Sequence, residues 1–221
     1  MEGSSGKGNV RFIGNDTWEL CDLPKDQKAL PTKWVFDTRN PGALKERFKA
    51  RLVARGDIAT KGIDFEETYA PVVNMVSIRL LIVISALLDL EIEHWDVVAA
   101  FLNGIIDHEI YIKQPQGFED GSARVCRLKK AIYGLPQSAR TFYFRLNEKL
   151  SQMGFHHLET DWAIWIKDNA YITCHVDDMM VSRNRDFVDR TFSELVSRRM
   201  VTRGGTEGYS VIGHLCCVVV A

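Results

Sequence analysis

The stretch Tyr171–Ser182, YITCHVDDMMVS, decides the fold that this chain is expected to adopt. Its two apolar runs, Tyr171–Val176 and Met179–Val181, flank a single polar pair, Asp177 and Asp178. Runs of this length, rich in β-branched and aromatic residues, predict a β-hairpin with both carboxylates at its tip. Adjacent negative charges repel, and a divalent cation such as Mg²⁺, which prefers hard oxygen ligands, would offset that repulsion. Aspartate is also a common turn residue, so the pair alone leaves both interpretations open.

The composition indicates a folded chain with two locally basic segments. Of the 221 residues, 46% are hydrophobic and 26% are charged, which is typical of a globular core rather than of disorder. The net charge is −1, so the chain as a whole does not attract polyanions. Residues 33–61, however, carry eight basic and three acidic side chains, and residues 123–149 carry seven basic and one acidic. Both segments suit contact with phosphate, and both equally suit a solvated surface.

The cysteines and the apolar runs argue against several classes of protein. The five cysteines include no CxxC pair and the histidines have no zinc-ligand spacing, so neither a disulfide framework nor a zinc site is expected. The longest apolar runs, Leu80–Leu90 and Val211–Ala221, are too short to span a bilayer. No signal peptide is visible, and residues 1–14 are expected to be a disordered lead-in. We therefore expect a soluble, intracellular, reduced protein that does not bind a membrane.

Hydrophobic patterning predicts an α+β fold. After an irregular lead-in at Asn15–Pro31, the predicted strands besides the hairpin are Lys33–Asp37, Phe48–Arg55, Ile92–Val97, Glu109–Lys113, Val125–Leu128 and Ala163–Ile166. The predicted helices are Val76–Leu90, Ser138–Met153 and Asp186–Met200. The first of them is predominantly apolar over more than three turns, so we expect it to be buried. This order of elements places helices behind an antiparallel sheet, which is an α+β layout.

A third acid accompanies the hairpin pair. Asp96 ends the apolar strand Ile92–Val97, about eighty residues before the hairpin. Antiparallel packing of that strand against the hairpin would bring Asp96, Asp177 and Asp178 to one edge of the sheet. Three carboxylates around two Mg²⁺ suit in-line phosphoryl transfer, because one metal activates the attacking oxygen and the other stabilises the leaving oxygens. A two-metal nuclease or cyclase would also use paired acids, and spacing along the chain does not establish that these acids meet.

Seven segments carry a resemblance to a known family. They are KWVF (33–36), RFKARLVARG (47–56), GIDFEETYAPVV (62–73), DVVAAFLNG (96–104), EIYIKQPQGFED (109–120), VCRLKKAIYGLPQSAR (125–140) and HVDD (175–178). Together, and in this order, they resemble the reverse transcriptase domain of copia-type LTR-retrotransposon Pol polyproteins. The resemblance implies a right-hand polymerase fold, in which an antiparallel palm sheet is backed by helices, a fingers subdomain is present and the thumb is largely missing. It implies one domain at 15–221, with fingers at about 15–75 and 105–140 and palm at about 76–104 and 141–221.

The resemblance also implies a reaction and its metal ligands. Asp96, Asp177 and Asp178 would be the catalytic carboxylates. With the backbone carbonyl of Val97 they would hold two Mg²⁺ ions, for which Mn²⁺ is a possible substitute. The reaction would be RNA-directed DNA polymerisation, in which a nucleotide passes from a dNTP to the 3′-OH of a DNA primer on an RNA template.

Five residues fall on positions that meet the substrates in the family. Phe101 would lie under the sugar and reject a 2′-OH by its bulk, although the residue alone would be interpreted as a core aromatic. Gln137 would touch the incoming nucleotide and the template, although alone it is a polar residue at a helix start. Lys49 and Arg51 lie in the basic hairpin expected to hold the triphosphate. His175 would support the primer end.

Three departures from the family pattern leave a second function open. The hairpin tip of the family is usually Tyr-Val-Asp-Asp, and here His175 replaces the tyrosine. Val98 stands where a lysine or a polar residue is usual, and the chain ends at Ala221, where a thumb would begin. The alternative function is therefore an inactive or truncated transposon-derived fragment that binds nucleic acid without polymerising. No RNase H or integrase segment is recognised, so these parts of Pol would be partners outside this chain, in cytoplasmic particles and then the nucleus.

Overall fold

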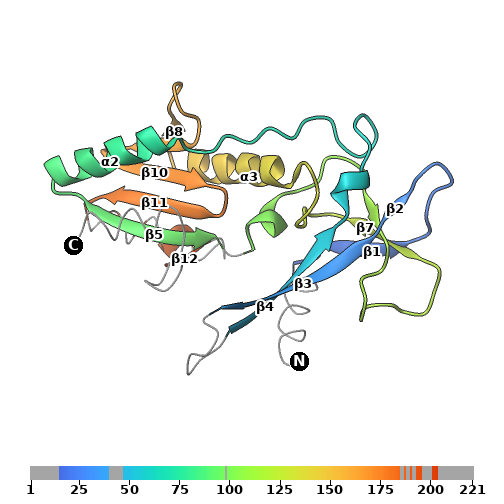
Figure 1. Cartoon of the computed structure of the whole chain (residues 1–221). Helices are drawn as coiled ribbons and strands as arrows, with labels where there is room; N and C mark the ends of the chain where they lie inside the picture. Colours follow the sequence, from blue (N-terminus) through green and yellow to red (C-terminus); the bar gives the residue numbers. More distant parts are fainter. Residues whose placement is uncertain are drawn as a thin grey trace. The chain divides into compact units, whose positions relative to one another are not determined.

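The predicted strands assemble into separate sheets in the computed structural model (Figure 1). The structure describes residues 15–39, 47–97, 99–184, 187, 190, 193–195 and 201–203. These residues belong to two compact units. The first holds the described residues up to Tyr69 together with Phe101–Phe142, and the second holds Ala70–Ala100 together with the described residues from Tyr143 onward. The mixture of sheets and helices confirms the α+β prediction. The predicted lead-in at 1–14, Val98, most of the helix at 186–200 and the tail at 211–221 lie outside the described residues.

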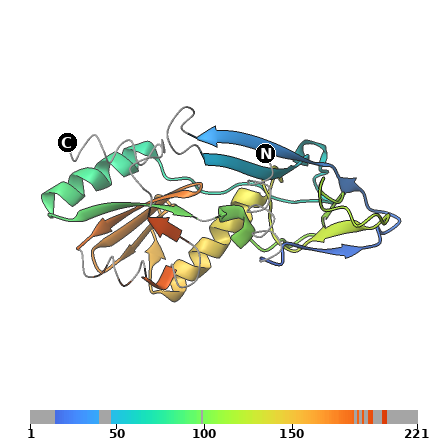
Figure 2. The same ribbon diagram turned by 90° about the horizontal axis from the view of Figure 1, so that it is seen from below.

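The second unit contains a six-stranded antiparallel sheet. Its strand order is β12-β5-β11-β10-β9-β8. The strands are β5 (Glu91–Val97), β8 (His156–His157), β9 (Ile164–Lys167), β10 (Ala170–His175), β11 (Asp178–Arg183) and β12 (Val201–Arg203). The predicted hairpin is β10–β11, and β5 pairs with β11 as expected. The short strands β8 and β12 were not predicted; β12, red in Figure 2, lies beside β5.

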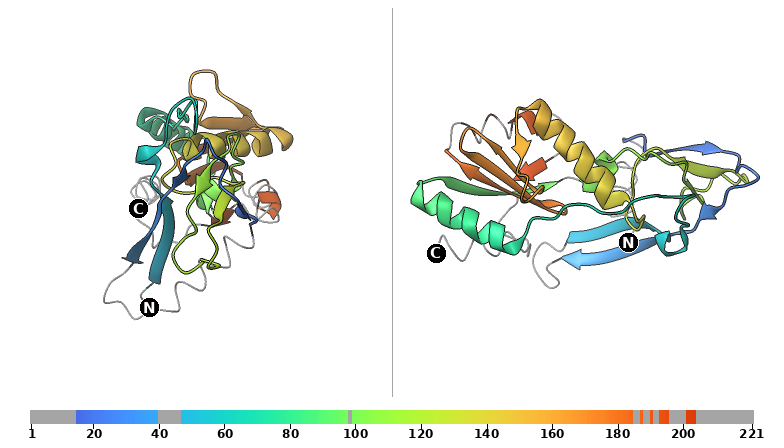
Figure 3. Two further views of the ribbon diagram at one scale, coloured as in Figure 1. Left: turned by 90° about the vertical axis from the view of Figure 1, so that its right-hand side faces the viewer. Right: turned by 90° about the horizontal axis from the view of Figure 1, so that it is seen from above.

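Two helices cover opposite faces of this sheet. Helix α2 (Met75–Leu87) packs Ile78, Leu81 and Ile82 against Ile164 and Met180. Helix α3 (Ser138–Gln152) meets the other face, since Trp165, the neighbour of Ile164 on β9, donates a hydrogen bond from Nε1 to Asn147 Oδ1 at 2.9 Å. The right-hand view of Figure 3 shows the two helices on either side of the sheet. The prediction of α3 is confirmed to within one residue at its end.

Local contacts decide where α2 begins. The Asn74 side chain caps the helix by accepting a hydrogen bond from the Val76 N–H at 2.9 Å. Asp161 supports the same turn, because its Oδ2 accepts from the Asn74 N–H at 3.1 Å and from the Ser77 hydroxyl at 2.8 Å. Asp161 immediately precedes the segment that leads into β9, so one carboxylate links the start of the helix to the sheet.

The prediction that this first helix is buried was wrong for half of its surface. Four apolar side chains at helical spacing face solvent: Val76, Leu80, Val83 and Leu87 are 69%, 58%, 55% and 79% exposed. Ten of the thirteen positions of α2 are apolar, and they occur on both the buried and the exposed side, so the pattern carries little information about which face will find a partner. The sequence pattern could therefore identify the helix but not its orientation on the sheet.

The first unit contains a four-stranded sheet and a separate hairpin. The four strands have the order β1-β7-β6-β2 and are β1 (Trp18–Cys21), β2 (Ala29–Leu30), β6 (Tyr111–Ile112) and β7 (Val125–Leu128). The hairpin is β3 (Thr32–Arg39) with β4 (Arg47–Ala54), close to the two strands predicted there. A short 3₁₀ turn lies at Gly56–Ile58, and a second at Ala100–Asn103 belongs to this unit from Phe101 onward.

The prediction of an irregular lead-in was wrong because β1 and β2 lie within it. Both strands are short and owe their pairing to distant partners: β1 pairs antiparallel with β7, and β2 pairs parallel with β6. Sequence patterns only a few residues long do not encode such partners. None of the helices in the described part of the chain has the length and apolar character needed to cross a bilayer.

Candidate functional site

Strand register brings two of the three predicted acids face to face. In the β5–β11 pair Asp178 lies directly opposite Asp96, so both side chains leave the same face of the sheet. The third acid is next to them, because the Val97 N–H donates a hydrogen bond to the backbone oxygen of Asp177 at 2.9 Å. Asp96 is exposed, whereas Asp177 and Asp178 are half-buried. Residues about eighty positions apart in sequence thus share one end of the sheet.

The hairpin tip differs from the prediction by one residue. The turn consists of Val176 and Asp177, while Asp178 is the first residue of β11 and pairs with His175. Only Asp177 therefore lies in the turn itself. The shift follows from alternation, because Cys174 pairs with Met179 and both are buried on the same face.

Val176 holds an unusual backbone conformation at this tip. Its φ is +62°, in the left-handed region that favours glycine at the first position of a two-residue hairpin turn. A β-branched residue is rare there, and such strain concentrates at functional sites. The conformation aims the carbonyl of Val176 at Cys174, whose Sγ donates to it at 3.3 Å.

One residue beside these three acids, His94, was not predicted from the sequence. Its Nε2 lies 3.0 Å from Oδ1 of Asp178, and both side chains are largely shielded from solvent. His94 is two residues before Asp96 on β5, and residues two apart on a strand share a face. This period-2 spacing is the signal that would have found it.

Two side chains of β10 next to the acids, Cys174 and His175, have polar atoms that are buried. Burial and the nearby Asp177 and Asp178 carboxylates raise the pKa of the Cys174 thiol, so it stays protonated. The Nδ1 of His175 is buried without a hydrogen-bond partner among the described residues. In the part of the chain that the structure describes, no three or more His, Cys, Asp or Glu side chains are gathered tightly enough to hold a metal ion. The acids share an edge without forming a preassembled metal cluster.

The other predicted residues lie in the first unit. Lys49 and Arg51 occupy one face of the β3–β4 hairpin, since Lys49 pairs with Asp37 and Arg51 pairs with Val35. The Arg51 Nη1 lies 3.7 Å from Asp37 Oδ2, and its guanidinium stands 5.8 Å from the centre of the Tyr133 ring. Two cations on one face fit a role in binding an anion.

Gln137 and Phe101 also belong to the first unit. Gln137 is 3% exposed and donates from Nε2 to the backbone oxygen of Asp64 at 2.9 Å, while its Oε1 finds no partner among the described residues. It lines a pocket of about 190 Å³, together with Phe65, Glu66, Glu67, Asp107, His108, Arg140 and Thr141. Phe101 packs edge-to-face on Tyr133 with ring centres 4.6 Å apart. The predicted residues thus form two groups, one in each unit.

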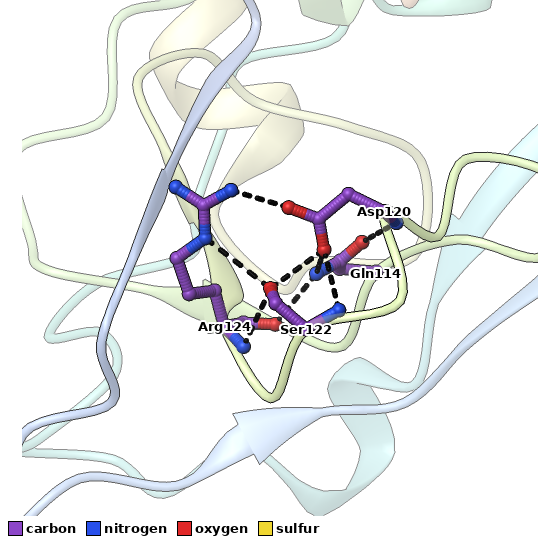
Figure 4. Close-up of polar contacts among 4 residues, drawn as sticks. All are labelled: Gln114, Asp120, Ser122 and Arg124. Carbon is purple, nitrogen blue, oxygen red and sulfur yellow. Dashed lines mark hydrogen bonds and ion pairs between the residues drawn. The ribbon is translucent and has the colours of Figure 1, made fainter.

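A different cluster of polar residues occupies the loop between β6 and β7 (Figure 4). Asp120 accepts hydrogen bonds from the Gln114 amide at 2.8 Å, from the Ser122 N–H at 3.0 Å and from the Ser122 hydroxyl at 2.6 Å, and it pairs with Arg124. These donors hold the pKa of Asp120 well below its usual range. The cluster is charged but internally compensated.

Comparison with known proteins decides the family. Residues 15–200 match the sequence profile described as "Reverse transcriptase (RNA-dependent DNA polymerase)". The chain belongs to this reverse transcriptase family. It is 41% identical over 175 residues to the retrovirus-related Pol polyprotein from transposon TNT 1-94 of Nicotiana tabacum. This match covers 76% of the chain and 13% of that protein.

Two further relatives of this reverse transcriptase domain come from Arabidopsis thaliana. They are the retrovirus-related Pol polyproteins from transposons RE2 and RE1, which are 34% and 32% identical over 209 residues. These matches cover 91% of the chain and 14% of each relative. All three relatives are copia-type Pol polyproteins, which confirms the resemblance seen in the sequence. The chain spans about one seventh of their length.

Proposed function

We propose that this chain is a reverse transcriptase module of a copia-type retrotransposon. It would transfer a nucleotide from a dNTP to the 3′-OH of a DNA primer on an RNA template. The observation that carries the proposal is the register of the six-stranded sheet, in which Asp178 faces Asp96 beside the turn that holds Asp177. Membership of the reverse transcriptase family supports the same reaction.

The two compact units correspond to two subdomains in this proposal. The second unit is the palm, an antiparallel sheet with helices against it, and the first unit is the fingers. The proposed bounds, fingers at about 15–75 and 105–140 and palm at about 76–104 and 141–221, lie close to the boundaries of the compact units. That agreement supports the division into subdomains.

Asp96, Asp177, Asp178 and the carbonyl of Val97 are the proposed ligands of two Mg²⁺ ions, which Mn²⁺ could replace. Carboxylate and carbonyl oxygens are the ligands that Mg²⁺ prefers, so the donor set fits the metal. Bound ions would activate the primer hydroxyl and stabilise the leaving pyrophosphate oxygens. The protein's own contribution is to hold like charges together at one end of a sheet, where Coulomb repulsion favours a cation.

The remaining predicted residues would bind and select the substrates. Lys49 and Arg51 would neutralise the triphosphate, and Phe101 would exclude a ribonucleotide by contact with its 2′-OH. Gln137 would meet the nucleotide and the template. His175 would support the primer end in place of the tyrosine usual in the family. The template, the primer and the other parts of Pol, RNase H and integrase, are the proposed partners, with cytoplasmic particles and the nucleus as the proposed locations.

A specific observation favours a second candidate function, a nucleic-acid-binding fragment without polymerase activity. His175 replaces the tyrosine usual at the hairpin tip of the family, and its buried Nδ1 has no hydrogen-bond partner among the described residues. A chain of this kind would bind a primer–template through its basic faces, with an affinity that falls as salt rises, and would add no nucleotide.

Primer extension separates the two functions. The purified chain is incubated with a DNA primer on an RNA template, four dNTPs and Mg²⁺ or Mn²⁺, beside the variant Asp177→Ala. The polymerase proposal expects extension by the native chain and none by the variant. If both proteins bind the primer–template equally, in a salt-dependent way, and neither extends it, the binding fragment is the correct description.

A further inference from the structure

Tyr133 connects two residues that the proposed function assigns to different parts of the nucleotide. Its ring meets Phe101 edge-to-face at 4.6 Å, and the Arg51 guanidinium lies 5.8 Å from the ring centre. Phe101 is the proposed contact of the sugar, and Arg51 is a proposed contact of the triphosphate. These three residues come from distant parts of the sequence but from the same compact unit.

The backbone around Tyr133 is fixed against strand β4. The Tyr133 carbonyl accepts a hydrogen bond from the Ala54 N–H at 2.8 Å, and Val53 and Tyr133 form a β-bridge. The next residue, Gly134, has a φ of +89°, and a Cβ there would lie 2.2 Å from the Ala54 oxygen. Only glycine allows this approach. The loop therefore holds the Tyr133 ring at a set distance from Arg51, which is on the same strand.

The two ring contacts have a geometry that restricts their partners. An edge-to-face pair limits rotation of the Phe101 ring. A guanidinium within about 6 Å of a ring centre is attracted to the ring by a cation–π interaction. This interaction remains when the guanidinium exchanges one anionic partner for another. Arg51 has such a partner in Asp37, at 3.7 Å, which an incoming phosphate would have to displace. Tyr133 would then be the contact that keeps Arg51 in place through the exchange.

We propose that Tyr133 is a positioning residue for the incoming nucleotide: it holds Phe101 in the orientation that rejects a 2′-OH and holds Arg51 toward the triphosphate. This inference rests on the proposed polymerase function. It goes beyond it by naming the aromatic ring that couples sugar selection to triphosphate binding.

The test measures selection rather than rate alone. For the native chain, Tyr133→Leu and Tyr133→Phe, the dissociation constants of dGTP and GTP are measured on a primer–template, and kcat and KM are measured for their incorporation. Tyr133→Leu should reduce discrimination against GTP by about tenfold and raise the KM for dGTP severalfold, with a smaller change in kcat, because small misplacements near a reacting group are costly. Tyr133→Phe keeps the ring and should behave as the native chain.

Two controls distinguish positioning from general damage. Phe118→Leu removes another ring of the same unit, one that stacks on Trp34 at 6.2 Å. Trp34 pairs with Leu52, on the face of the hairpin away from Arg51, so discrimination should be unchanged. In the background Phe101→Ala, adding Tyr133→Leu should cause no further loss of discrimination, because the group that Tyr133 positions is absent.

The outcomes separate this inference from the proposed function. A native chain that binds and incorporates neither nucleotide would overturn both. A native chain that prefers dGTP, with Tyr133→Leu retaining that preference or losing only as much as Phe118→Leu, would overturn the role of Tyr133 and leave the polymerase proposal intact.

Discussion

Two groups of carboxylates in this protein differ in the hydrogen bonds and ion pairs that surround them. In the loop between β6 and β7, Asp120 receives hydrogen bonds from an amide, a backbone N–H and a hydroxyl, and it pairs with Arg124. At the end of the β5–β11 pair, Asp178 faces Asp96 and accepts from His94, while the Asp177 carboxylate has no side-chain hydrogen bond to the described residues. One group contains an arginine that pairs with its carboxylate, and the other places three carboxylates at one end of a sheet.

This difference separates a structural cluster from a candidate binding site. A compensated carboxylate stabilises the fold and gains little from an added cation. Like charges held together at a sheet edge cost free energy, and a bound cation recovers that cost. The sequence DD at 177–178 and the sequence EDGSAR at 119–124 are both acidic, but only the contacts reveal which one is already neutralised.

Replacing one aspartate of each group by asparagine should give the largest difference between the two groups, and that difference is in polymerase activity. Asp96→Asn should reduce nucleotide incorporation by more than about a hundredfold, which exceeds the usual effect of losing a group that only supports a metal ligand. Asp120→Asn, the matched control, should leave incorporation near the native level. Steady-state primer extension measures both. Equal activity of the two variants would remove the functional distinction between the groups.

Metal addition should stabilise the fold only through the sheet edge. At a Mg²⁺ or Mn²⁺ concentration tenfold above the dissociation constant, binding contributes about 1.4 kcal/mol, which raises the melting temperature of a chain of this size by about 3–5 °C. Thermal unfolding should show this rise for the native chain and for Asp120→Asn, but not for Asp177→Asn. A rise that persists in Asp177→Asn would locate the ion elsewhere.

Without metal, the same substitutions should change stability in opposite directions. Asp177→Asn removes one of two adjacent like charges, so the free energy of unfolding should increase by roughly 0.5 kcal/mol. Asp120→Asn weakens the pairing with Arg124, so stability should decrease. Urea denaturation in the presence of a chelator compares the three proteins. A decrease for both variants would contradict the view that the sheet edge is strained by its charge.

The smallest expected effect is the pH dependence that Asp120 contributes. Its pKa is lower in the folded chain than in the unfolded chain. Its stabilising contribution is therefore complete above the ordinary aspartate pKa of about 4 and is lost as the pH falls through the lowered value. Between pH 6 and pH 3 the native chain should lose slightly more stability than Asp120→Asn. Parallel denaturation curves for the two proteins at every pH would argue against the cluster.

The strands were predicted well where the pattern is local. The β10–β11 hairpin, the basic β3–β4 hairpin and β7 lie within a few residues of their predicted positions, because alternating apolar side chains record a half-buried strand directly. The strands β1 and β2 were not predicted in the lead-in, because each is short and pairs with a distant strand, β7 or β6. The apolar helix α2 was found, but its exposed side was not, since burial depends on what packs against each face.

The predicted site shows the same difference between features that a local sequence motif predicts and features that depend on distant residues. Motifs in the sequence predicted Asp96, Asp177 and Asp178 as site residues, and motifs predicted Arg51 and Phe101 in the same way; these roles stay predictions. The sequence pattern placed Asp178 in the turn, although the turn holds Val176 and Asp177. No sequence motif predicts the contacts of Tyr133, and the contact between His94 and Asp178 could have been anticipated only from the period-2 spacing of His94 and Asp96 on β5.

The sequence by itself determined the family, the order of the longer strands and of helices α2 and α3, and the chemical types available at the candidate site. These are properties of short segments, in which residue type and periodicity act directly on local backbone and burial. The tertiary structure alone decided that Asp178 faces Asp96, that α2 leaves an apolar stripe in solvent, and that Tyr133 touches both Arg51 and Phe101. Register and packing are set by partners far along the chain, because a strand or helix gains most of its stability from the element it pairs with.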